Sequence, residues 1–397
     1  MRISVPSIPL LSTRPPAPQR SIQEAVERVA EFLLPGNVAI LTGAGVSVDS
    51  GIRAYRGNDG RYMNPNYKPL FYHQLMDESE AGYAFRQRYW LRSYLGYSHP
   101  RAGYPAMRAS LPNPTHYGLA ALQYAGVAPR LITQNVDGLH HRALNLSPGM
   151  KNDSILELHG SLHHVHCKHG HVVDRMTFQH WLSAANPQWK AFADEAERTG
   201  NKPRTNPDGD VAIEHLGAAY NTFIVPECPS CLLQDRINSV HKPEVIFFGE
   251  SIPQPVKDQS FHDVEEADRL LVIGTTLATY SAFRLLKRAV ELDKPVLLLN
   301  VGPSRGDSVS EVDRIDMASG LIIRDVVQGC IVGTAAAEDP IVAKMLRSGV
   351  VKPPEDDTRG AEVGGGGGGG EIISSFRSIR READIHRSRK VVDIANT

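Results

Sequence analysis

Four short apolar runs, each followed directly by small or amide-bearing residues, leave this chain few possible folds. The runs cover 38–41, 131–133, 270–273 and 296–299, and segments of helical character separate them. Near-continuous apolar runs are typical of strands that are buried on both faces of a parallel sheet. We therefore predict an α/β fold organised on a parallel sheet.

The residues that follow these runs indicate a ligand site. They are Thr42-Gly43-Ala44-Gly45-Val46-Ser47, Gln134-Asn135-Val136-Asp137, Gly274-Thr275-Thr276 and Asn300-Val301-Gly302. In open α/β sheets, ligands bind beyond the carboxyl ends of the strands, so the four endings together describe one site. Closely spaced glycines also let backbone N–H groups approach an anionic ligand, which favours a phosphate-bearing nucleotide.

The first of these turns departs from the usual dinucleotide fingerprint. Val48 stands where the third glycine of that fingerprint belongs, so a dehydrogenase-type turn is disfavoured. Taken alone, this turn could equally well be a tight strand-to-helix connection that binds no ligand. The agreement between the four strand ends is what favours a nucleotide pocket.

Composition excludes several other classes of protein. The chain has 397 residues, with 43 Lys and Arg against 44 Asp and Glu and 41% hydrophobic residues, as expected of a soluble globular protein. Its balanced charge gives no indication of nucleic-acid or membrane-surface binding. No apolar stretch reaches the roughly 18 residues that span a bilayer, and the length favours two or three structural units.

The two ends of the chain differ from the middle. Residues 1–20 contain three arginines and no acidic residue, which resembles a mitochondrial transit peptide; a merely disordered N-terminus is the alternative. We therefore expect a mitochondrial matrix location, with a cytoplasmic or nuclear location as the alternatives. Residues 351–397 contain seven consecutive glycines and a basic tail, which is the composition of a flexible linker.

The sequence predicts two helical segments. Ser21 and Glu24 form a capping box that predicts a helix start, with apolar residues on one helical face. These apolar residues are Ile22, Ala25, Val26, Val29, Phe32 and Leu33.

Between 56 and 114 the chain becomes aromatic and basic, most densely at Tyr83, Phe85, Arg86, Arg88, Tyr89, Trp90, Arg92 and Tyr94. The residues alone favour a helical insertion with an aromatic core under extended arginine side chains.

Cysteine usage indicates a metal site in a reducing compartment and not a disulfide-rich secreted protein. Of the four cysteines, two form the pair Cys228-Pro-Ser-Cys231. Together with Cys167 they could supply three thiolates to a tetrahedral, structural zinc ion. Gly170 stands where a second pair would place its other cysteine, so His169 or His171 could complete a Cys3His site. A metal-free knuckle is the alternative.

A histidine-rich segment follows the motif Leu158-His159-Gly160. Its members, His163, His164, His166, His169 and His171, could be metal ligands, could include a catalytic imidazole, or could form a polar loop without a special role. His159 is distinct because it stands at a strand-like end directly before a glycine. We expect its imidazole to point into a cleft.

Several motifs in a fixed order resemble the sirtuin family, in particular its class II branch with the mitochondrial sirtuin-4-like members. The strand-end motifs above are joined by Ser50-Gly51-Ile52, Gly138-Leu139-His140, Lys242-Pro243-Glu244-Val245-Ile246-Phe247-Phe248-Gly249-Glu250, Leu277 and Pro303. The resemblance covers 21–330. It implies a Rossmann-like domain that binds NAD and a smaller zinc-binding and helical domain.

On this resemblance, 1–20 is a leader, 21–350 is the catalytic domain and 351–397 is a linker and tail. The Rossmann-like parts would be about 21–55, 115–160 and 243–350, with a helical insertion at about 56–114 and a zinc-binding module at about 161–242.

The resemblance also implies which residues bind NAD. Gly43, Ala44, Gly45, Ser47 and Arg56 would meet the phosphates and ribose, and Gln134, Asn135 and Asp137 would hold the nicotinamide end. Gly274, Thr275, Thr276, Asn300 and Val301 would lie on the adenosine side.

The implied reaction is NAD-dependent deacylation of protein lysines, and acyl-lysine proteins are the implied partners of a monomeric enzyme. The acyl-lysine carbonyl oxygen would attack the nicotinamide ribose, and His159 would act as general base on a ribose hydroxyl, so that ADP-ribose receives the acyl group. The residues implied to pair with the substrate peptide by β-strand addition are Val245, Phe247, Phe248, Gly249 and Glu250. Tyr89 and Arg92 match a Tyr-x-x-Arg element that lines the acyl pocket and suits an acidic acyl group.

Two departures from the family pattern leave alternatives open. The family usually has Pro-Asp where this chain has Arg53-Ala54, a change that would loosen the loop over the cofactor and remove a carboxylate. The zinc site lacks one cysteine, at Gly170. The alternatives are mono-ADP-ribosyl transfer to proteins, or an NAD- or ADP-ribose-binding regulatory module with weakened catalysis.

Overall fold

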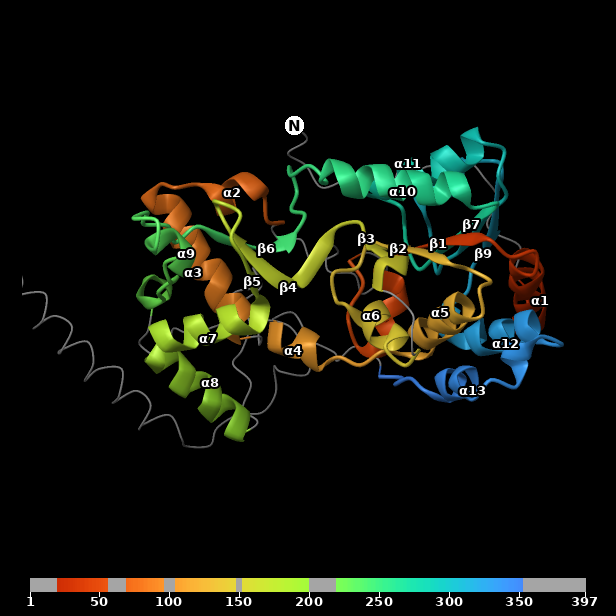
Figure 1. Cartoon of the computed structure of the whole chain (residues 1–397), viewed down its shortest axis with the longest axis horizontal. Coiled ribbons are helices and arrows are strands. Elements are labelled where there is room, and N and C mark those ends of the chain that lie inside the picture. Colours follow the sequence, from red (N-terminus) through yellow and green to blue (C-terminus); the bar gives the residue numbers. More distant parts are fainter. Residues whose placement is uncertain (1–19, 56–68, 96–103, 148–151, 200–218, 353–397) are drawn as a thin grey trace, which may run out of the picture. The chain divides into compact units, whose positions relative to one another are not determined.

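The computed structural model describes residues 20–55, 69–95, 104–147, 152–199 and 219–352 (Figure 1). The chain divides into two compact units. The first comprises Met1–His73, Met107–His166 and Lys242–Glu355, and the second comprises Gln74–Ala106, Cys167–His241 and Asp356–Thr397.

The first unit is built on a six-stranded parallel sheet with the strand order β3-β2-β1-β7-β8-β9. The strands are β1 (Val38–Thr42), β2 (Arg130–Thr133), β3 (Ile155–Glu157), β7 (Arg269–Ile273), β8 (Val296–Leu299) and β9 (Val312–Ile315). All four strands expected from the apolar runs are present, so the predicted α/β fold with a parallel sheet is confirmed.

Side chains of the central strand alternate between two hydrophobic cores. Val38 and Ile40 of β1 belong to the first core, whereas Ala39 and Leu41 belong to the second. Every residue of β1 is buried. Because both faces of the strand are covered by apolar side chains, its sequence shows no alternation with polar residues.

Helices cover both faces of the sheet (Figure 1). The first core is completed by α1 (Ile22–Leu33), α5 (Pro114–Tyr124), α6 (Leu139–Leu144), α12 (Ser319–Ile331) and α13 (Pro340–Arg347). The second core is completed by α10 (Gln254–Glu266) and α11 (Tyr280–Glu291). None of the helices in the described ranges combines the length and the hydropathy needed to cross a bilayer.

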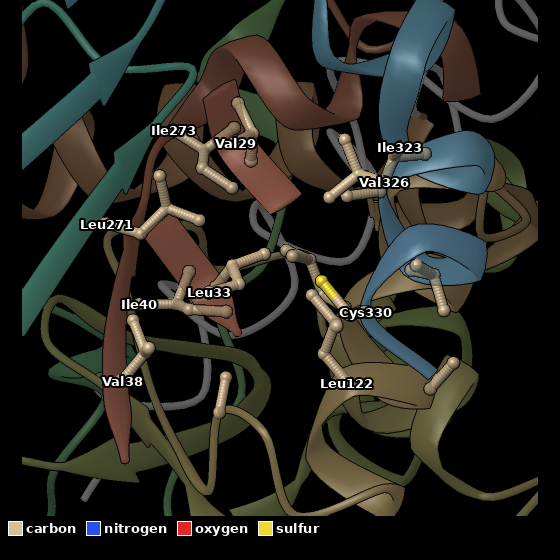
Figure 2. Packing of buried hydrophobic residues seen from close by; sticks show 14 of the residues in the cluster. Val29, Leu33, Val38, Ile40, Leu122, Leu271, Ile273, Ile323, Val326 and Cys330 are labelled. Carbon is tan, nitrogen blue, oxygen red and sulfur yellow. The ribbon is translucent and has the colours of Figure 1, made fainter. Parts of the chain in front are cut away.

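The first core is tightly occupied by side chains from distant parts of the chain. Figure 2 shows Leu33 of α1, Ile40 of β1, Leu271 of β7 and Cys330 of α12 meeting there. Burial raises the pKa of the Cys330 thiol to about 11. This cysteine therefore stays protonated and packs as a small apolar side chain.

The capping box at the start of α1 is confirmed. Ser21 Oγ accepts a hydrogen bond from the Glu24 N–H at 3.2 Å, and the Glu24 carboxylate accepts one from the Ser21 N–H at 2.7 Å. Such a cap contributes about 1 kcal/mol to helix stability. The predicted buried face is correct except at Ile22, the first residue of the helix, which is 53% exposed.

A second, three-stranded sheet has the order β5-β4-β6. Its strands are β4 (Gly160–Cys167), β5 (Val172–Asp174) and β6 (His241–Val245). The helices α3 (Glu80–Leu95), α7 (Arg175–Ala185), α8 (Pro187–Thr199) and α9 (Pro229–Leu232) belong to the second unit. The chain passes between the units in α2 (Tyr72–Met76), α4 (Tyr104–Ala109), β4 and β6.

Aromatic side chains fill the second unit. Trp90 is fully buried, with its ring centroid 4.6 Å from that of Phe178, so the expected aromatic core is confirmed at this position. The buried Arg175 guanidinium lies 4.5 Å from the Tyr104 ring centroid and 5.2 Å from that of Trp90. Burial lowers the pKa of Arg175 to about 10, so the side chain remains charged at neutral pH.

Candidate functional site

The turn after β1 is held against the turn after β7. A short 3-10 helix, Ala44–Ser50, follows Gly43. The Gly43 N–H donates to the Ile273 carbonyl at 3.1 Å, and the Gly45 N–H donates to the Gly274 carbonyl at 2.8 Å. A Cβ on Gly45 would lie 2.7 Å from the Gly274 carbonyl oxygen, so only glycine permits this approach.

These contacts give the two glycines a structural role, because the N–H groups of Gly43 and Gly45 donate to the protein itself. The predicted binding of phosphates by this turn stays a prediction. The small size of the two glycines lets two strand-end turns touch. The joined turns still lie at the carboxyl edge of the parallel sheet, which is where ligands bind in such folds.

A buried polar network lies behind the turn after β1. Ser47 Oγ donates to Asp137 Oδ2 at 2.8 Å, accepts from Asn135 Nδ2 at 3.0 Å and lies 3.3 Å from His116 Nε2. Burial raises the pKa of Asp137, while hydrogen bonds from the Leu139 N–H and Ser47 act in the opposite direction. The structure thus brings together three residues that the sequence assigned to the cofactor: Ser47, Asn135 and Asp137.

Two buried histidines adjoin this network. The rings of His116 and His140 lie 4.8 Å apart, and His140 Nε2 lies 3.1 Å from Thr42 Oγ1. Burial lowers the pKa of His140 to about 3 and holds that of His116 well below its ordinary value. Both rings are therefore neutral at physiological pH and serve as hydrogen-bonding groups.

One amide side chain joins the ends of β2 and β7. Gln134 Nε2 donates to Thr275 Oγ1 at 2.9 Å and to the Thr42 carbonyl at 3.2 Å. Thr279 Oγ1 in turn donates to Gln134 Oε1 at 3.1 Å. Gln134 is thereby fixed on both its donor and its acceptor side.

The end of β8 forms a turn of its own. Asn300 Nδ2 donates to the carbonyls of Val301 and Gly302, at 3.0 and 3.1 Å. The Thr276 carbonyl accepts from the Arg305 N–H at 2.9 Å. Asn300 is buried and Val301 is exposed, so of these two residues Val301 presents its side chain to solvent.

His159 lies between β3 and β4, and both of its ring nitrogens meet protein groups. Nε2 is 2.8 Å from Ser281 Oγ, and the ring hydrogen-bonds to the Gln134 backbone carbonyl. The His159 carbonyl accepts from the Ile246 N–H at 2.9 Å. Desolvation lowers the pKa of His159 to about 4, so its imidazole is neutral at pH 7 and able to accept a proton.

The segment implied to bind the peptide is a tightly held turn after β6. Its Phe247 N–H donates to Glu250 Oε2 at 2.9 Å, and the Phe248 carbonyl accepts from the Tyr72 N–H at 2.9 Å. Glu250 Oε1 also pairs with the buried Lys242 Nζ at 2.9 Å. The carboxylate of Glu250 thus stabilises the turn from inside.

The remaining members of this segment, Val245 and Gly249, are half-buried. Val245 is the last residue of β6. Gly249 has a φ of +83°, a conformation that favours glycine, so it closes the turn.

Three thiols and one imidazole converge in the second unit. Cys167 ends β4, His171 directly precedes β5, and Cys228 and Cys231 lie at the start of α9. The ligand atoms of all four residues lie within 4.8 Å of one another. His171 Nδ1 is 3.4 Å from the Sγ atoms of Cys167 and Cys231 and 3.6 Å from that of Cys228.

These distances fit a tetrahedral zinc ion. Ligands at zinc–sulfur and zinc–nitrogen distances of about 2.3 and 2.0 Å lie about 3.5–3.8 Å apart around a tetrahedron. The Cys167 and Cys231 sulfurs are 3.7 Å apart. The set is therefore Cys3His: the fourth ligand, which the sequence left open between His169 and His171, is His171.

Groups around the cluster support the ligands. The Gln234 side-chain amide lies 3.3 Å from His171 Nε2, the nitrogen that faces away from the sulfurs. Asn238 Nδ2 donates to Cys231 Sγ at 3.4 Å. Such outer contacts fix the orientation and tautomer of metal-binding side chains.

Four other residues singled out in the sequence take no part in the contacts described above. Tyr89 and Arg92 lie one turn apart on α3 in the second unit, and both are half-buried. Arg53 and Ala54 are half-buried in the irregular segment after the 3-10 helix. Arg56 lies outside the described residues. The roles predicted for these residues stay predictions.

The model of the Sir2 family matches residues 43–281. The chain belongs to the Sir2 family. This sirtuin is 39% identical over 313 residues to an NAD-dependent protein deacylase, SIR4, of Batrachochytrium dendrobatidis, an alignment that covers 77% of this chain and 94% of the relative.

Two further matches agree with this membership. An NAD-dependent protein deacylase, Sirt4, of Drosophila melanogaster is 34% identical to this sirtuin, covering 73% of this chain and 83% of the relative. A solved structure described as "Structural Basis for the Mechanism and Regulation of Sir2 Enzymes" has a TM-score of 0.52 and 24% identity, and covers 78% of this chain and 98% of that chain. The structural match supports the fold, and the resemblance first seen in the motifs is confirmed.

Proposed function

We propose that this sirtuin is an NAD-dependent protein-lysine deacylase that releases nicotinamide and transfers the acyl group of a lysine to ADP-ribose. The observation that carries the proposal is the state of His159, a neutral imidazole held by Gln134 and Ser281 beside the carboxyl edge of the sheet. A general base must be neutral at working pH and within reach of the proton that it removes. The names of the relatives support NAD as the cofactor.

The groups at the strand ends would shape the NAD site. The hydroxyl and amide groups of Ser47, Gln134 and Asn135 hydrogen-bond to other protein groups, and they would hold in place the strand-end turns to which NAD binds. NAD, when bound, supplies the ribose carbon that exchanges nicotinamide for the acyl oxygen. His159 would take the proton of a ribose hydroxyl at Nε2. The turn after β6 would offer its backbone to an extended substrate peptide.

A panel of acyl-lysine peptides tests this proposal. With NAD present, we expect nicotinamide release in step with deacylation, and loss of both by about 100-fold or more in His159→Ala. The matched control is His164→Ala, because the His164 side chain is 51% exposed and pairs only with Glu244 among the contacts described. Wild-type rates in His159→Ala would contradict the proposed base.

The same assay separates the alternative functions. Nicotinamide release without loss of the acyl group would favour mono-ADP-ribosyl transfer to a protein. Tight NAD or ADP-ribose binding with neither product would favour a regulatory binding module, the outcome expected if Arg53 and Ala54 have weakened catalysis.

For the acyl group, we propose that Tyr89 and Arg92 favour acidic or long acyl chains. A guanidinium binds a carboxylate with two parallel hydrogen bonds, which an acetyl group cannot accept in the same way. Arg92→Met should therefore lower kcat/KM for a dicarboxylic acyl peptide by about tenfold and leave that for an acetyl peptide nearly unchanged. Equal losses for both peptides would contradict this role.

We also propose a mitochondrial location, supported by the arginine-containing and acid-free composition of residues 1–20. The full chain with a C-terminal tag should fractionate with the matrix, and a chain lacking residues 2–20 should not. A cytoplasmic or nuclear signal from the full chain would contradict this location.

A further inference from the structure

Ser281, which lies outside the family motifs quoted above, contacts the imidazole of His159. Its Oγ lies 2.8 Å from His159 Nε2. Ser281 is the second residue of α11, and the apolar face of that helix, including Phe283 and Leu286, is buried in the second core. Because the core fixes the start of the helix, the hydroxyl is held in place beside the imidazole.

The opposite side of the imidazole determines which nitrogen carries the proton. The ring hydrogen-bonds to the backbone carbonyl of Gln134, and a carbonyl oxygen can only accept. Since Ser281 occupies Nε2, the nitrogen that faces Gln134 is Nδ1, and it carries the hydrogen. In a neutral imidazole the lone pair then resides on Nε2, so the Ser281 O–H donates to it.

Both contacts on the ring depend on one short segment. Thr279 Oγ1 donates to Gln134 Oε1 at 3.1 Å, and Thr279 precedes Ser281 by two residues. Gln134 also donates to Thr275 Oγ1 at 2.9 Å. The start of α11 therefore fixes the side chain of Gln134, the residue whose backbone carbonyl meets the ring, and supplies the hydroxyl that meets Nε2.

We infer that Ser281 is a positioning residue that keeps His159 in the Nδ1–H tautomer. The Nε2 lone pair, which accepts from the Ser281 O–H in this structure, then has no hydrogen and can receive the reacting hydroxyl in place of the serine. This inference rests on the proposed function of His159 as general base. A serine hydroxyl suits the task because it donates and accepts. It donates to neutral Nε2 while no substrate hydroxyl is present, turns its hydrogen away when that hydroxyl donates to Nε2, and can accept from Nε2–H after proton transfer.

The proton transfer balances without any further group. The O–H bond of the substrate hydroxyl breaks, its electron pair stays on the oxygen, and the proton forms a bond with Nε2. The imidazolium then carries hydrogen on both nitrogens, and the Gln134 carbonyl still accepts from Nδ1–H. In the other tautomer, Nε2 would already carry hydrogen and could not act as base.

The test combines nitrogen NMR of the imidazoles with kinetics in three variants. In wild type labelled with 15N-histidine, the His159 signal, assigned by its loss in His159→Gln, should show the Nδ1–H tautomer at pH 7. Ser281→Ala should show a mixture of tautomers and a fall in kcat of about tenfold, which is less than the roughly 100-fold or larger contribution of the base itself. Ser281→Thr, which keeps a hydroxyl, should restore both readouts.

Controls separate positioning from folding. Alanine is favourable in a helix, so Ser281→Ala should fold, and its KM for NAD should stay within about twofold of wild type. Ser308→Ala, at an exposed serine, is the matched control. A wild-type tautomer and kcat in Ser281→Ala would overturn the inference, as would an Nε2–H tautomer in wild type. Full deacylation by His159→Gln would instead overturn the proposed role of His159 as base. The NMR spectra of wild type and Ser281→Ala would still show whether Ser281 determines the tautomer of His159.

Discussion

Replacing Glu157 with glutamine is expected to stabilise the protein, relative to wild type, more at pH 8 than at pH 5. Glu157 ends β3, and its side chain is 21% exposed. Desolvation, followed by the nearby charges of Asp137 and Glu244, raises its pKa from 4.5 to about 7, although a hydrogen bond with Ser161 opposes the rise. His141 Nε2 is 3.7 Å from Glu157 Oε1.

The direction of the pH effect follows from where the proton is bound. Between pH 4.5 and about 7 the folded protein keeps a proton on Glu157 that the unfolded chain has lost. Below pH 4.5 Glu157 is protonated in both the folded and the unfolded protein, and its ionisation costs no stability. As the pH rises from 4.5 to about 7, the free energy of unfolding falls, because the unfolded chain loses the proton more readily than the folded protein. The rise in pKa corresponds to about 3 kcal/mol, of which about 2.5 kcal/mol falls between pH 5 and pH 8.

Glutamine keeps the size and polarity of Glu157 and does not ionise. The free energy of unfolding of Glu157→Gln minus that of wild type should therefore rise by about 2.5 kcal/mol between pH 5 and pH 8. Other titrating groups, such as His140 and His159, are present in both proteins and cancel in this difference to first order. Glu338→Gln is the matched control, because the Glu338 side chain is exposed and its charge is not among those that raise the pKa of Glu157.

Urea unfolding at pH 5, 6, 7 and 8 is the appropriate assay. It should be followed by far-ultraviolet circular dichroism, since the three tryptophans, Trp90, Trp181 and Trp189, all lie in the second unit and Glu157 lies in the first. A difference between variant and wild type that does not change with pH would refute the reasoning.

Three further predictions follow from other contacts. Gly160 has a φ of +75°, and a Cβ there would lie 1.8 Å from the Glu244 carbonyl oxygen; Gly160→Ala should therefore lower the melting temperature and the deacylation rate. Gly126→Ala, at a φ of +74° with no atom near its Cβ, should show only the backbone cost of about 1–2 kcal/mol; equal losses in both variants would contradict the role of the contact. His171→Ala should lose zinc by elemental analysis, whereas His171→Cys should keep it and, loaded with cobalt, show stronger thiolate charge-transfer absorption than wild type; full zinc content in the alanine variant would exclude His171 as a ligand. Finally, because the pKa of His159 is about 4 and the base must be neutral, kcat/KM should show no acidic limb near pH 6.5 and should fall only as pH approaches 4; a limb at 6.5 in a pH profile would contradict the desolvated imidazole.

The central strands could be predicted from sequence, whereas the edge strands could not. β1 and β7 are buried on both faces, so their sequences are almost entirely apolar. β9 lies at one edge of the sheet and reads Val-Asp-Arg-Ile, with only its first and last residues buried. β3, at the other edge, has three residues and ends in Glu157. A strand that is covered on fewer sides carries a weaker apolar signal.

The sequence indicated candidate site residues only where they share a local motif. His159 and the strand-end residues stand in such motifs, and the thiolates Cys228 and Cys231 form a recognisable pair. Spacing could not choose between His169 and His171, because the choice depends on which imidazole the turn before β5 directs at the sulfurs. No local motif in the sequence marks Ser281 as a site residue, because Ser281 contacts His159 only after folding brings together residues that are far apart in the chain.

The order in which the sheet can assemble follows from the place of β1. This strand comes first in the chain yet lies in the middle of the sheet, and its register with β7 pairs Val38 with Arg269. During synthesis, residues up to Ile273 must therefore emerge before β7 can pair with β1 and cover that edge of the strand. Contacts this distant in sequence close slowly. The turn after β1 also depends on Gly274, so the carboxyl edge of the sheet becomes complete only after β7 has joined it.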